Sequence, residues 1–314
     1  MKIVLLEELG VSDKIIEKHA KKLKEMGHTF VAYPKNADAE VQAERSKDAD
    51  VIMIANMPLS EKAVQEADNL KYIDVAFTGV DHIPMELAKQ KEIAVSNASG
   101  YATQAVAEIS ISFMIQLLRN MAQTEERCRQ GGTKAGLIGN LLCGKTVGIV
   151  GAGAIGKRVA ALCKAFGCSV LAYNRSEVKD PSIDEQVSLE ELLKRSDIVS
   201  LHCPLTEATK GMIGEKELSL MKKEAILVNT ARGAVVDSTA LATALKNGEI
   251  AGAATDVFEM EPPVPGDHPL LHCPNMVVTP HIAFASVESM EQRADIVFDN
   301  LYSWLEGTQK NIIL

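Results

Sequence analysis

The feature that most constrains the fold is a glycine-rich turn between an apolar run and an amphipathic segment. Residues 147–150 have the composition of a buried strand, the turn Gly151-Ala-Gly-Ala-Ile-Gly156 follows at once, and helical periodicity continues through Phe166. In such a unit the first glycine allows a tight turn, the second lets a pyrophosphate approach the backbone, and the third lets the helix pack on the strand. Structural turns and methyltransferase loops also match this spacing, but the complete strand–turn–helix–strand frame predicts a dinucleotide site.

The end of the next expected strand bears on which dinucleotide is bound. Residues 169–173 are followed by Asn174, Arg175 and Ser176, where dinucleotide folds commonly place a carboxylate that bonds the adenosine ribose. Without that charge a 2′-phosphate is not repelled, and Arg175 and Ser176 offer donors for it. We therefore expect NADP rather than NAD. The alternative is that Arg175 faces solvent and Asn174 bonds the ribose hydroxyls of NAD.

Apolar runs of strand length alternate with amphipathic segments of helix length along the chain, which is typical of parallel sheets flanked by helices. Ser12 is the expected N-cap of the first helix, and Gly27 is its expected end. One uninterrupted helix is expected from Thr103 to about Arg129. The expected strands fall in two series, residues 2–6, 29–33, 50–55, 71–75 and 93–96, and then 146–150, 169–173, 198–202, 226–229, 252–256 and 276–279.

Composition narrows the function. A chain of 314 residues, 46% of them hydrophobic, is long enough for two domains. Its net charge of −9 has no compensating basic stretch, which argues against nucleic acid and an anionic membrane as partners. The six cysteines follow no disulfide-scaffold spacing and no secretory signal is found, so we expect a reduced, cytoplasmic protein that binds small metabolites. No set of ligands has zinc spacing, and we expect no metal.

Three ionisable side chains, Arg232, Glu261 and His281, each follow an expected strand in the second half of the chain. Ligands of open α/β sheets lie beyond the carboxyl ends of the strands. A histidine can donate and accept a proton, and a guanidinium suits a carboxylate. Taken singly, each residue has an ordinary structural explanation, as a loop histidine, a solvated turn glutamate or a helix-capping arginine. Together they make an acid–base set.

In this order the motifs resemble the family of D-2-hydroxyacid dehydrogenases, which includes glycerate dehydrogenases (hydroxypyruvate reductases), phosphoglycerate dehydrogenase, D-lactate dehydrogenase and formate dehydrogenase. The resemblance spans nearly the whole chain, and as a set its motifs are far more specific than the glycine turn. It rests on residues 78–81, 105–108, 144–156, 201–206, 229–237, 256–262 and 274–281.

The resemblance implies a role for each site residue. His281 would give and take the proton, Glu261 would bond its other nitrogen, and Arg232 would bind the substrate's carboxylate and carbonyl. Asp256 would contact the nicotinamide region, although it could instead be an N-cap or a buried partner for a backbone donor. The implied substrate contacts are Asn56, Gly79 and Val80. The implied cofactor site is lined by Thr78, Thr103, Gly151, Gly153, Ala154, Ile155, Gly156, Asn174, Arg175, Ser176, His202, Cys203, Pro204, Thr209, Thr230, Ala231, Asp256 and Ala283.

We expect an NAD(P)-dependent enzyme that reduces a small 2-oxo acid to a D-2-hydroxy acid. Hydroxypyruvate and glyoxylate are the substrates we expect first, because the expected substrate loops have no basic cluster that would bind a phosphorylated substrate. A D-lactate or branched-chain 2-hydroxyacid dehydrogenase is an alternative. A formate site would be expected to dispense with the Glu261–His281 pair. A non-catalytic dinucleotide sensor, like corepressors of this fold, would be expected to carry interaction surfaces or tails beyond Leu314.

The expected architecture is α/β, with two doubly wound parallel-sheet domains. A Rossmann cofactor domain, residues 100–286, is inserted in a flavodoxin-like substrate domain formed by residues 1–99 and 287–314. Substrate would lie in the cleft between them, and closure would exclude water. The family also implies a homodimer, for which the helix from Thr103 offers an apolar surface. Trp304 is expected to belong to a packing face of the last helix.

Overall fold

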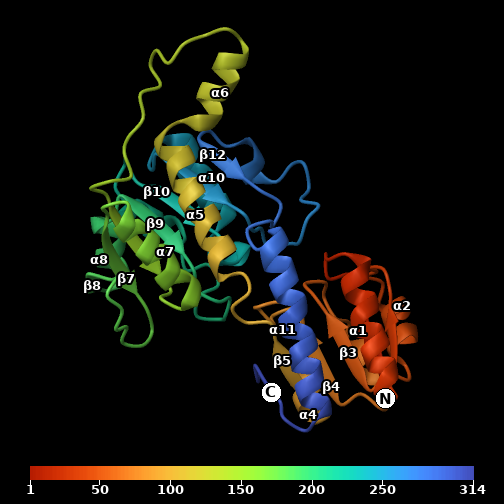
Figure 1. Cartoon of the computed structure of the whole chain (residues 1–314). Helices are drawn as coiled ribbons and strands as arrows, with labels where there is room; N and C mark the ends of the chain where they lie inside the picture. Colours follow the sequence, from red (N-terminus) through yellow and green to blue (C-terminus); the bar gives the residue numbers. More distant parts are fainter. The chain divides into compact units, whose positions relative to one another are not determined.

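The computed structural model describes all 314 residues, which divide into two compact units (Figure 1). Unit 1 comprises Met1–Ala102 and Ala285–Leu314, and unit 2 comprises Thr103–Phe284. These limits differ by two or three residues from the limits expected for the cofactor domain. Each unit has a parallel sheet and helices of its own, so the chain is α/β with two parallel sheets.

The sheet of unit 1 has the strand order β2-β1-β3-β4-β5, and all its strands are parallel, which is the flavodoxin-like order. Strands β3 and β4 are buried along their whole length, as expected for a parallel sheet with helices on both faces. The strands are β1 (Lys2–Leu5), β2 (Thr29–Ala32), β3 (Val51–Ile54), β4 (Tyr72–Val75) and β5 (Ala94–Asn97).

The helices of unit 1 include the last helix of the chain, which packs on the sheet through Trp304. Its ring stacks on that of Tyr72 in β4, with 4.8 Å between centroids. Ser12 precedes the first helix as expected, but its side chain makes no capping hydrogen bond, because the N–H of Ile15 already donates to the Ser12 carbonyl. The helices are α1 (Asp13–Glu25), α2 (Ala39–Ser46), α3 (Glu61–Glu66), α4 (Met85–Gln90) and α11 (Val287–Leu305).

The sheet of unit 2 has the strand order β12-β11-β10-β9-β6-β7-β8, which contains the Rossmann order with a seventh strand at one edge. The sequence did not indicate β8, because two exposed residues carry no hydrophobic pattern. The strands are β6 (Thr146–Val150), β7 (Ser169–Tyr173), β8 (Glu185–Gln186), β9 (Ile198–Leu201), β10 (Ile226–Asn229), β11 (Gly252–Thr255) and β12 (Met276–Val278).

The helix expected to run unbroken from Thr103 to Arg129 is two helices, so that prediction was wrong. Asn120 adopts the left-handed conformation (φ 49°, ψ 43°), so the last α-helical hydrogen bond of the first of the two is the one from the Arg119 N–H to the Ile115 carbonyl. The helices of unit 2 are α5 (Thr103–Leu118), α6 (Met121–Arg129), α7 (Ala154–Ala165), α8 (Leu189–Arg195), α9 (Glu215–Leu220) and α10 (Ser238–Asn247), with 3₁₀ turns η1 (Gly233–Val235) and η2 (Pro269–His272).

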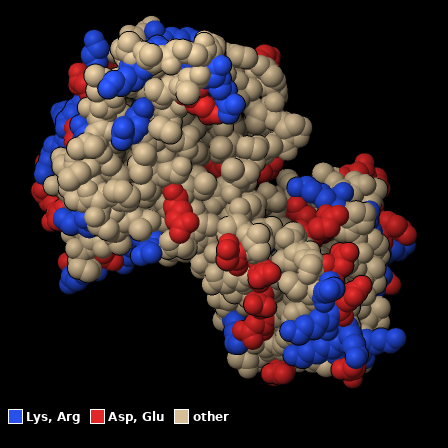
Figure 2. Space-filling view, turned by 45° about the horizontal axis from the view of Figure 1, so that its top comes forward, with Lys and Arg blue, Asp and Glu red and all other residues tan.

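The surface carries both signs of charge. Figure 2 shows Lys and Arg side chains interspersed with Asp and Glu side chains on the visible face. None of the helices combines the length and apolarity needed to cross a membrane.

Candidate active site

The glycine turn joins β6 to α7 as the sequence predicts, and two of its glycines have no room for a side chain. A Cβ on Gly151, whose φ is 95°, would lie 2.7 Å from the backbone nitrogen of Cys203. A Cβ on Gly156 would lie 2.1 Å from the Gly151 carbonyl oxygen. Gly153 has nothing within 4 Å of its Cβ position, which leaves its backbone open to a ligand at the N-terminus of α7, where Ala154 begins the helix.

Asn174, at the end of β7, ties the next loop to the glycine turn. Its Oδ1 accepts a hydrogen bond from the Ala152 N–H at 3.1 Å. Its Nδ2 donates to the carbonyl and the hydroxyl of Ser176, each at 3.1 Å. Arg175, between them, is exposed. The Asn174 amide therefore shapes the loop, and the Arg175 guanidinium is the cation that this loop presents.

Residues after β9 and β10 include a half-buried histidine whose Nδ1 atom is buried. The Nε2 of His202 lies 2.9 Å from the Ser200 hydroxyl, and burial lowers the pKa of His202 to about 3. His202 is therefore neutral at physiological pH and unsuited to donate a proton. Burial also raises the pKa of the Cys203 thiol, which keeps it protonated. The hydroxyl of Thr230 is 3.0 Å from that of Ser110 on α5.

The loop after β10 holds Arg232 by its backbone. The Asn229 side chain accepts from the Ala231 N–H and donates to the Arg232 carbonyl, both at 3.0 Å. The half-buried guanidinium donates to the Ala231 carbonyl at 2.8 Å. Gly233 packs so closely that a Cβ would lie 1.9 Å from the carbonyl carbon of Phe258. The loop that carries Arg232 and the segment that leads to Glu261 are therefore in direct backbone contact.

Glu261 and His281, predicted as a pair, are in contact. The His281 Nδ1 lies 3.0 Å and 2.9 Å from the two carboxylate oxygens of Glu261. Because a carboxylate only accepts, Nδ1 is the donor in this pair. The His281 side chain is 11% exposed, and its ring meets that of Phe284 edge to face. Its φ of 57° is uncommon for a residue with a Cβ.

Asp256, after β11, holds the segment that carries His281. One carboxylate oxygen accepts from the Thr279 hydroxyl at 2.5 Å and the Ile282 N–H at 2.8 Å, and the other from the Ala283 N–H at 2.8 Å. Its carbonyl accepts from the His281 N–H at 2.8 Å. The side chain is fully buried, and burial raises its pKa. Asp256 is thus a buried partner for backbone donors, which was the alternative expectation.

A second, partly buried network, which the sequence did not reveal, anchors the segment before Glu261. The Glu259 carboxylate accepts from the Ser238 hydroxyl and lies 3.0 Å from the His268 Nε2. His268 Nδ1 accepts from the Leu270 N–H at 3.3 Å, and the residue is only 8% exposed. No spacing rule joins residues of α10, this loop and η2.

The expected substrate residues of unit 1 follow its central strands. Asn56 lies after β3, and Gly79 and Val80 lie after β4, all half-buried. The Thr78 carbonyl accepts from the Asn97 Nδ2 at 2.7 Å. No group of three or more His, Cys, Asp or Glu residues lies close enough together to hold a metal ion.

Comparison with known proteins agrees with this arrangement. Residues 111–283 match the family model described as D-isomer specific 2-hydroxyacid dehydrogenase, NAD binding domain. The chain belongs to this family. As a D-2-hydroxyacid dehydrogenase, it is an oxidoreductase that uses a nicotinamide dinucleotide and acts on a CH–OH group.

Individual relatives match along most of their length. The dehydrogenase is 40% identical over 277 residues to a glyoxylate reductase of Korarchaeum cryptofilum, covering 85% of this chain and 83% of the relative. It is 37% identical over 297 residues to a glycerate dehydrogenase of Methylorubrum extorquens, covering 91% and 92%. Among solved structures, an acyclic imino acid reductase in complex with NADPH and D-Arg is 32% identical, with a TM-score of 0.92 and full coverage of both chains.

The glycine turn of the dehydrogenase generates a paired prediction. Gly153→Ala should keep the wild-type melting temperature but weaken NADPH binding about tenfold or more, because its Cβ meets no protein atom and would occupy the approach to the backbone. Gly156→Ala should lower the melting temperature by several degrees, because its Cβ overlaps a carbonyl oxygen. Thermal unfolding and fluorescence titration measure both. Equal effects of the two variants on unfolding would contradict this assignment.

Proposed function

We propose that the enzyme reduces a small 2-oxo acid, of the hydroxypyruvate or glyoxylate type, to its D-2-hydroxy acid. The observation that carries this proposal is the His281–Glu261 pair, with 2.9 Å between Nδ1 and the nearer carboxylate oxygen. The names of the glyoxylate reductase and glycerate dehydrogenase relatives support the substrate class. When bound, the reduced nicotinamide supplies a hydride, and the protein must supply a proton.

In the proposed mechanism, Nε2 of His281 gives a proton to the carbonyl oxygen during reduction and takes one back during oxidation. Glu261 fixes the orientation of the ring by accepting from Nδ1, so that Nε2 is the nitrogen that transfers the proton. Arg232 binds the substrate carboxylate and polarises the carbonyl, because its planar guanidinium offers several donors in one fork. Asn56, Gly79 and Val80 contact the rest of the substrate. Asp256 acts indirectly, through the backbone of residues 281–283.

The dinucleotide would be held by the glycine turn and by residues at the ends of the neighbouring strands. Gly153 and the N-terminus of α7 fit a pyrophosphate, since no protein atom occupies the space beside Gly153. His202, Cys203, Pro204, Thr209, Thr230, Ala231 and Ala283 of unit 2 and Thr78 of unit 1 complete the proposed lining, with Thr103 at the start of α5.

The proton donor is tested by comparing two histidines. His281→Ala should lower kcat with hydroxypyruvate or glyoxylate by roughly 10²-fold to 10⁴-fold, the usual contribution of general acid catalysis. His272→Ala is the matched control, because this exposed residue bonds only the Gly266 carbonyl, and it should leave kcat unchanged.

The measurement is the initial rate of reduced-cofactor consumption, with pyruvate and bulkier 2-oxo acids alongside. A fast reaction with pyruvate or a branched 2-oxo acid alone would favour the D-lactate or branched-chain activity. No turnover with any 2-oxo acid, despite tight cofactor binding, would reject the proposed reaction in favour of a dinucleotide sensor.

We also propose a preference for NADP over NAD. The loop after β7 has no carboxylate at Asn174, and it presents the Arg175 guanidinium beside the Ser176 hydroxyl. An exposed guanidinium suits a 2′-phosphate through paired hydrogen bonds.

Arg175→Ala should therefore lower kcat/KM for NADPH about tenfold while changing that for NADH little. Lys223→Ala, which removes an exposed cation just before β10, is the control and should change neither. A wild-type preference for NADH would overturn the NADP proposal and leave the proposed reaction intact.

We further propose that the enzyme is a homodimer whose contact lies on unit 2 around α6 and the segment after it. Figure 1 shows that this segment extends from the rest of unit 2. Its apolar side chains are exposed, with Met121 50%, Leu141 69% and Ile138 84% accessible. Light scattering should give twice the chain mass of 33.9 kDa, and Leu141→Asp should halve that value. A wild-type mass of one chain would reject the dimer.

A further inference from the structure

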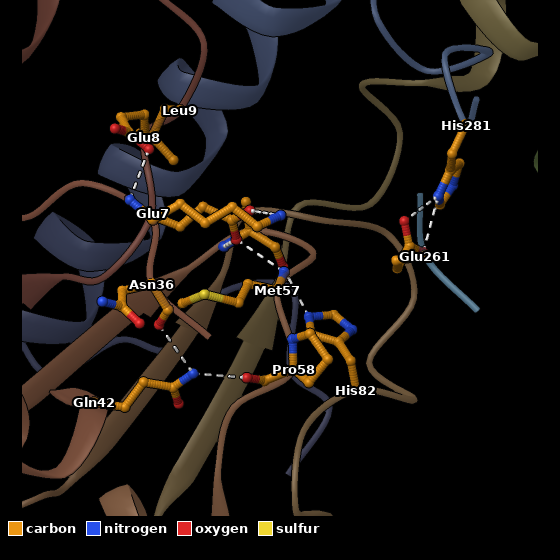
Figure 3. A network of polar contacts seen from close by, with 12 residues as sticks. Glu7, Glu8, Leu9, Asn36, Gln42, Met57, Pro58, His82, Glu261 and His281 are labelled. Carbon is orange, nitrogen blue, oxygen red and sulfur yellow. Dashed lines mark hydrogen bonds and ion pairs between the residues drawn. The ribbon is translucent and has the colours of Figure 1, made fainter. Parts of the chain in front are cut away.

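We propose that Glu7, which has no part in the reaction itself, is the positioning residue that holds the substrate loop of unit 1. This inference rests on the proposed function, because Asn56 in that loop is a proposed substrate contact. Glu7 follows β1, and the loop follows β3, its neighbour in the sheet. Figure 3 shows Glu7 beside the backbone that leads to Met57.

The Glu7 carboxylate bonds the backbone on both sides of Asn56. One oxygen, Oε2, accepts from the Ala55 N–H at 3.1 Å and from the Met57 N–H at 2.8 Å. Both bonds are buried, and the Glu7 side chain is 6% exposed. Two flanking amides that donate to one atom fix the direction of the peptide between them, and therefore where Asn56 projects.

The negative charge of Glu7 is balanced by two cations, Lys35 and the buried Arg293. Lys35 lies 2.9 Å from Oε1, with its side chain half exposed. Burial lowers the pKa of Arg293, and the Glu7 carboxylate opposes that shift. A carboxylate this deeply buried is tolerated only with such partners. The ion pair and the loop contacts thus use different oxygens, so the two can be separated by substitution.

Two other side chains, the half-buried His82 and the buried Gln42, hold the same loop further along. The Nε2 of His82 lies 2.7 Å from the Ala55 carbonyl and must donate, because a carbonyl only accepts. The Leu59 N–H donates back to the His82 carbonyl at 3.1 Å. Gln42, 1% exposed, donates to the Pro58 carbonyl at 3.1 Å and accepts from the Ser60 N–H at 2.9 Å. His82 also follows Gly79 and Val80, so it ties the two proposed substrate loops together.

A loop held by two buried side chains, Glu7 and Gln42, and by the half-buried His82 is preorganised for binding, so loosening it should weaken substrate binding in particular. Of these side chains, Glu7 is the one that bonds the amides of both neighbours of Asn56 in the chain. A merely structural carboxylate would, when removed, lower the amount of folded enzyme and leave KM values unchanged. The positioning role instead predicts a change confined to the 2-oxo acid.

The test measures KM for the 2-oxo acid, KM for the reduced cofactor, and kcat in five enzymes. Glu7→Ala should raise KM for the 2-oxo acid about tenfold, since it leaves two buried donors unsatisfied, and leave the cofactor KM within twofold. Glu7→Gln should restore KM to near the wild-type value, because its amide oxygen can accept both N–H bonds. The Lys35 ammonium cannot bond the new NH₂ group, but its side chain is half exposed and can turn to solvent. Lys35→Ala and Glu8→Ala are the matched controls, and neither should change KM for the 2-oxo acid, because they keep Oε2 of Glu7.

If Glu7→Ala does not fold, Glu7→Asp replaces it, since it keeps the charge but withdraws the oxygens by one methylene, and it should also raise KM. Hydrogen exchange of the Ala55 and Met57 amides should be faster in Glu7→Ala or Glu7→Asp than in wild type and Glu7→Gln. Unchanged KM in Glu7→Ala or Glu7→Asp, or a KM in Glu7→Gln as high as in Glu7→Ala, would overturn the role of Glu7 alone. No turnover by the wild-type enzyme would instead overturn the proposed function and this inference with it.

Discussion

Both units depend on one constraint, which is that a parallel sheet covered by helices on both faces buries its central strands entirely. Strands β3, β4, β9, β10 and β11 have no exposed residue. Polar chemistry is therefore confined to the segments beyond the strands. Parallel strands send these segments to the same edge of the sheet, so residues far apart in sequence meet there. Arg232, Glu261 and His281 in unit 2 are brought to one edge in this way.

The backbone of His281 is strained, and hydrogen bonds at this edge of the sheet offset the cost of that strain. A left-handed backbone costs roughly 1–2 kcal/mol for a residue with a Cβ, and His281 has this conformation with φ of 57°. Asp256 accepts four hydrogen bonds from residues 279–283, through its two carboxylate oxygens and its carbonyl. At about 1 kcal/mol each, these bonds exceed the cost. The hydrogen bonds to Asp256 therefore account for a left-handed backbone at His281 that a residue with a Cβ seldom adopts.

Much of the fold could be predicted from the sequence because strand burial leaves a direct signature. Eleven of the twelve strands lie in apolar runs that were expected, and the missing one, β8, is two exposed residues held by a single neighbour. The break at Asn120 was missed because asparagine is compatible with a helix and its left-handed conformation depends on the surrounding structure. Ser12 is the N-cap residue as expected, but its side chain makes no capping bond, because the Ile15 N–H donates to the Ser12 carbonyl instead.

The same distinction, between local sequence patterns and contacts set by the surrounding structure, decides which residues of the site could be predicted. His281 and Glu261 could be paired from motifs, and the structure places them in hydrogen-bond contact. The residues that hold the site, such as Glu7, His82 and Glu259, could not be assigned, because their partners are backbone groups and side chains from distant segments. Glu7 did carry one signal, a carboxylate just after an expected buried strand, whereas Asp256 was assigned a role from the family resemblance.

Glu7 and Asp256 make the same kind of contact, one in each unit. Glu7 follows β1 and binds amides after β3, the adjacent strand, and Asp256 follows β11 and binds amides after β12, again the adjacent strand. Amides beyond a strand end have left the hydrogen-bond ladder, and when buried they need an acceptor. A carboxylate on the neighbouring strand supplies several acceptor positions at one point. Because each carboxylate holds a segment that carries a proposed site residue, the need to satisfy buried backbone also determines where Asn56 and His281 lie.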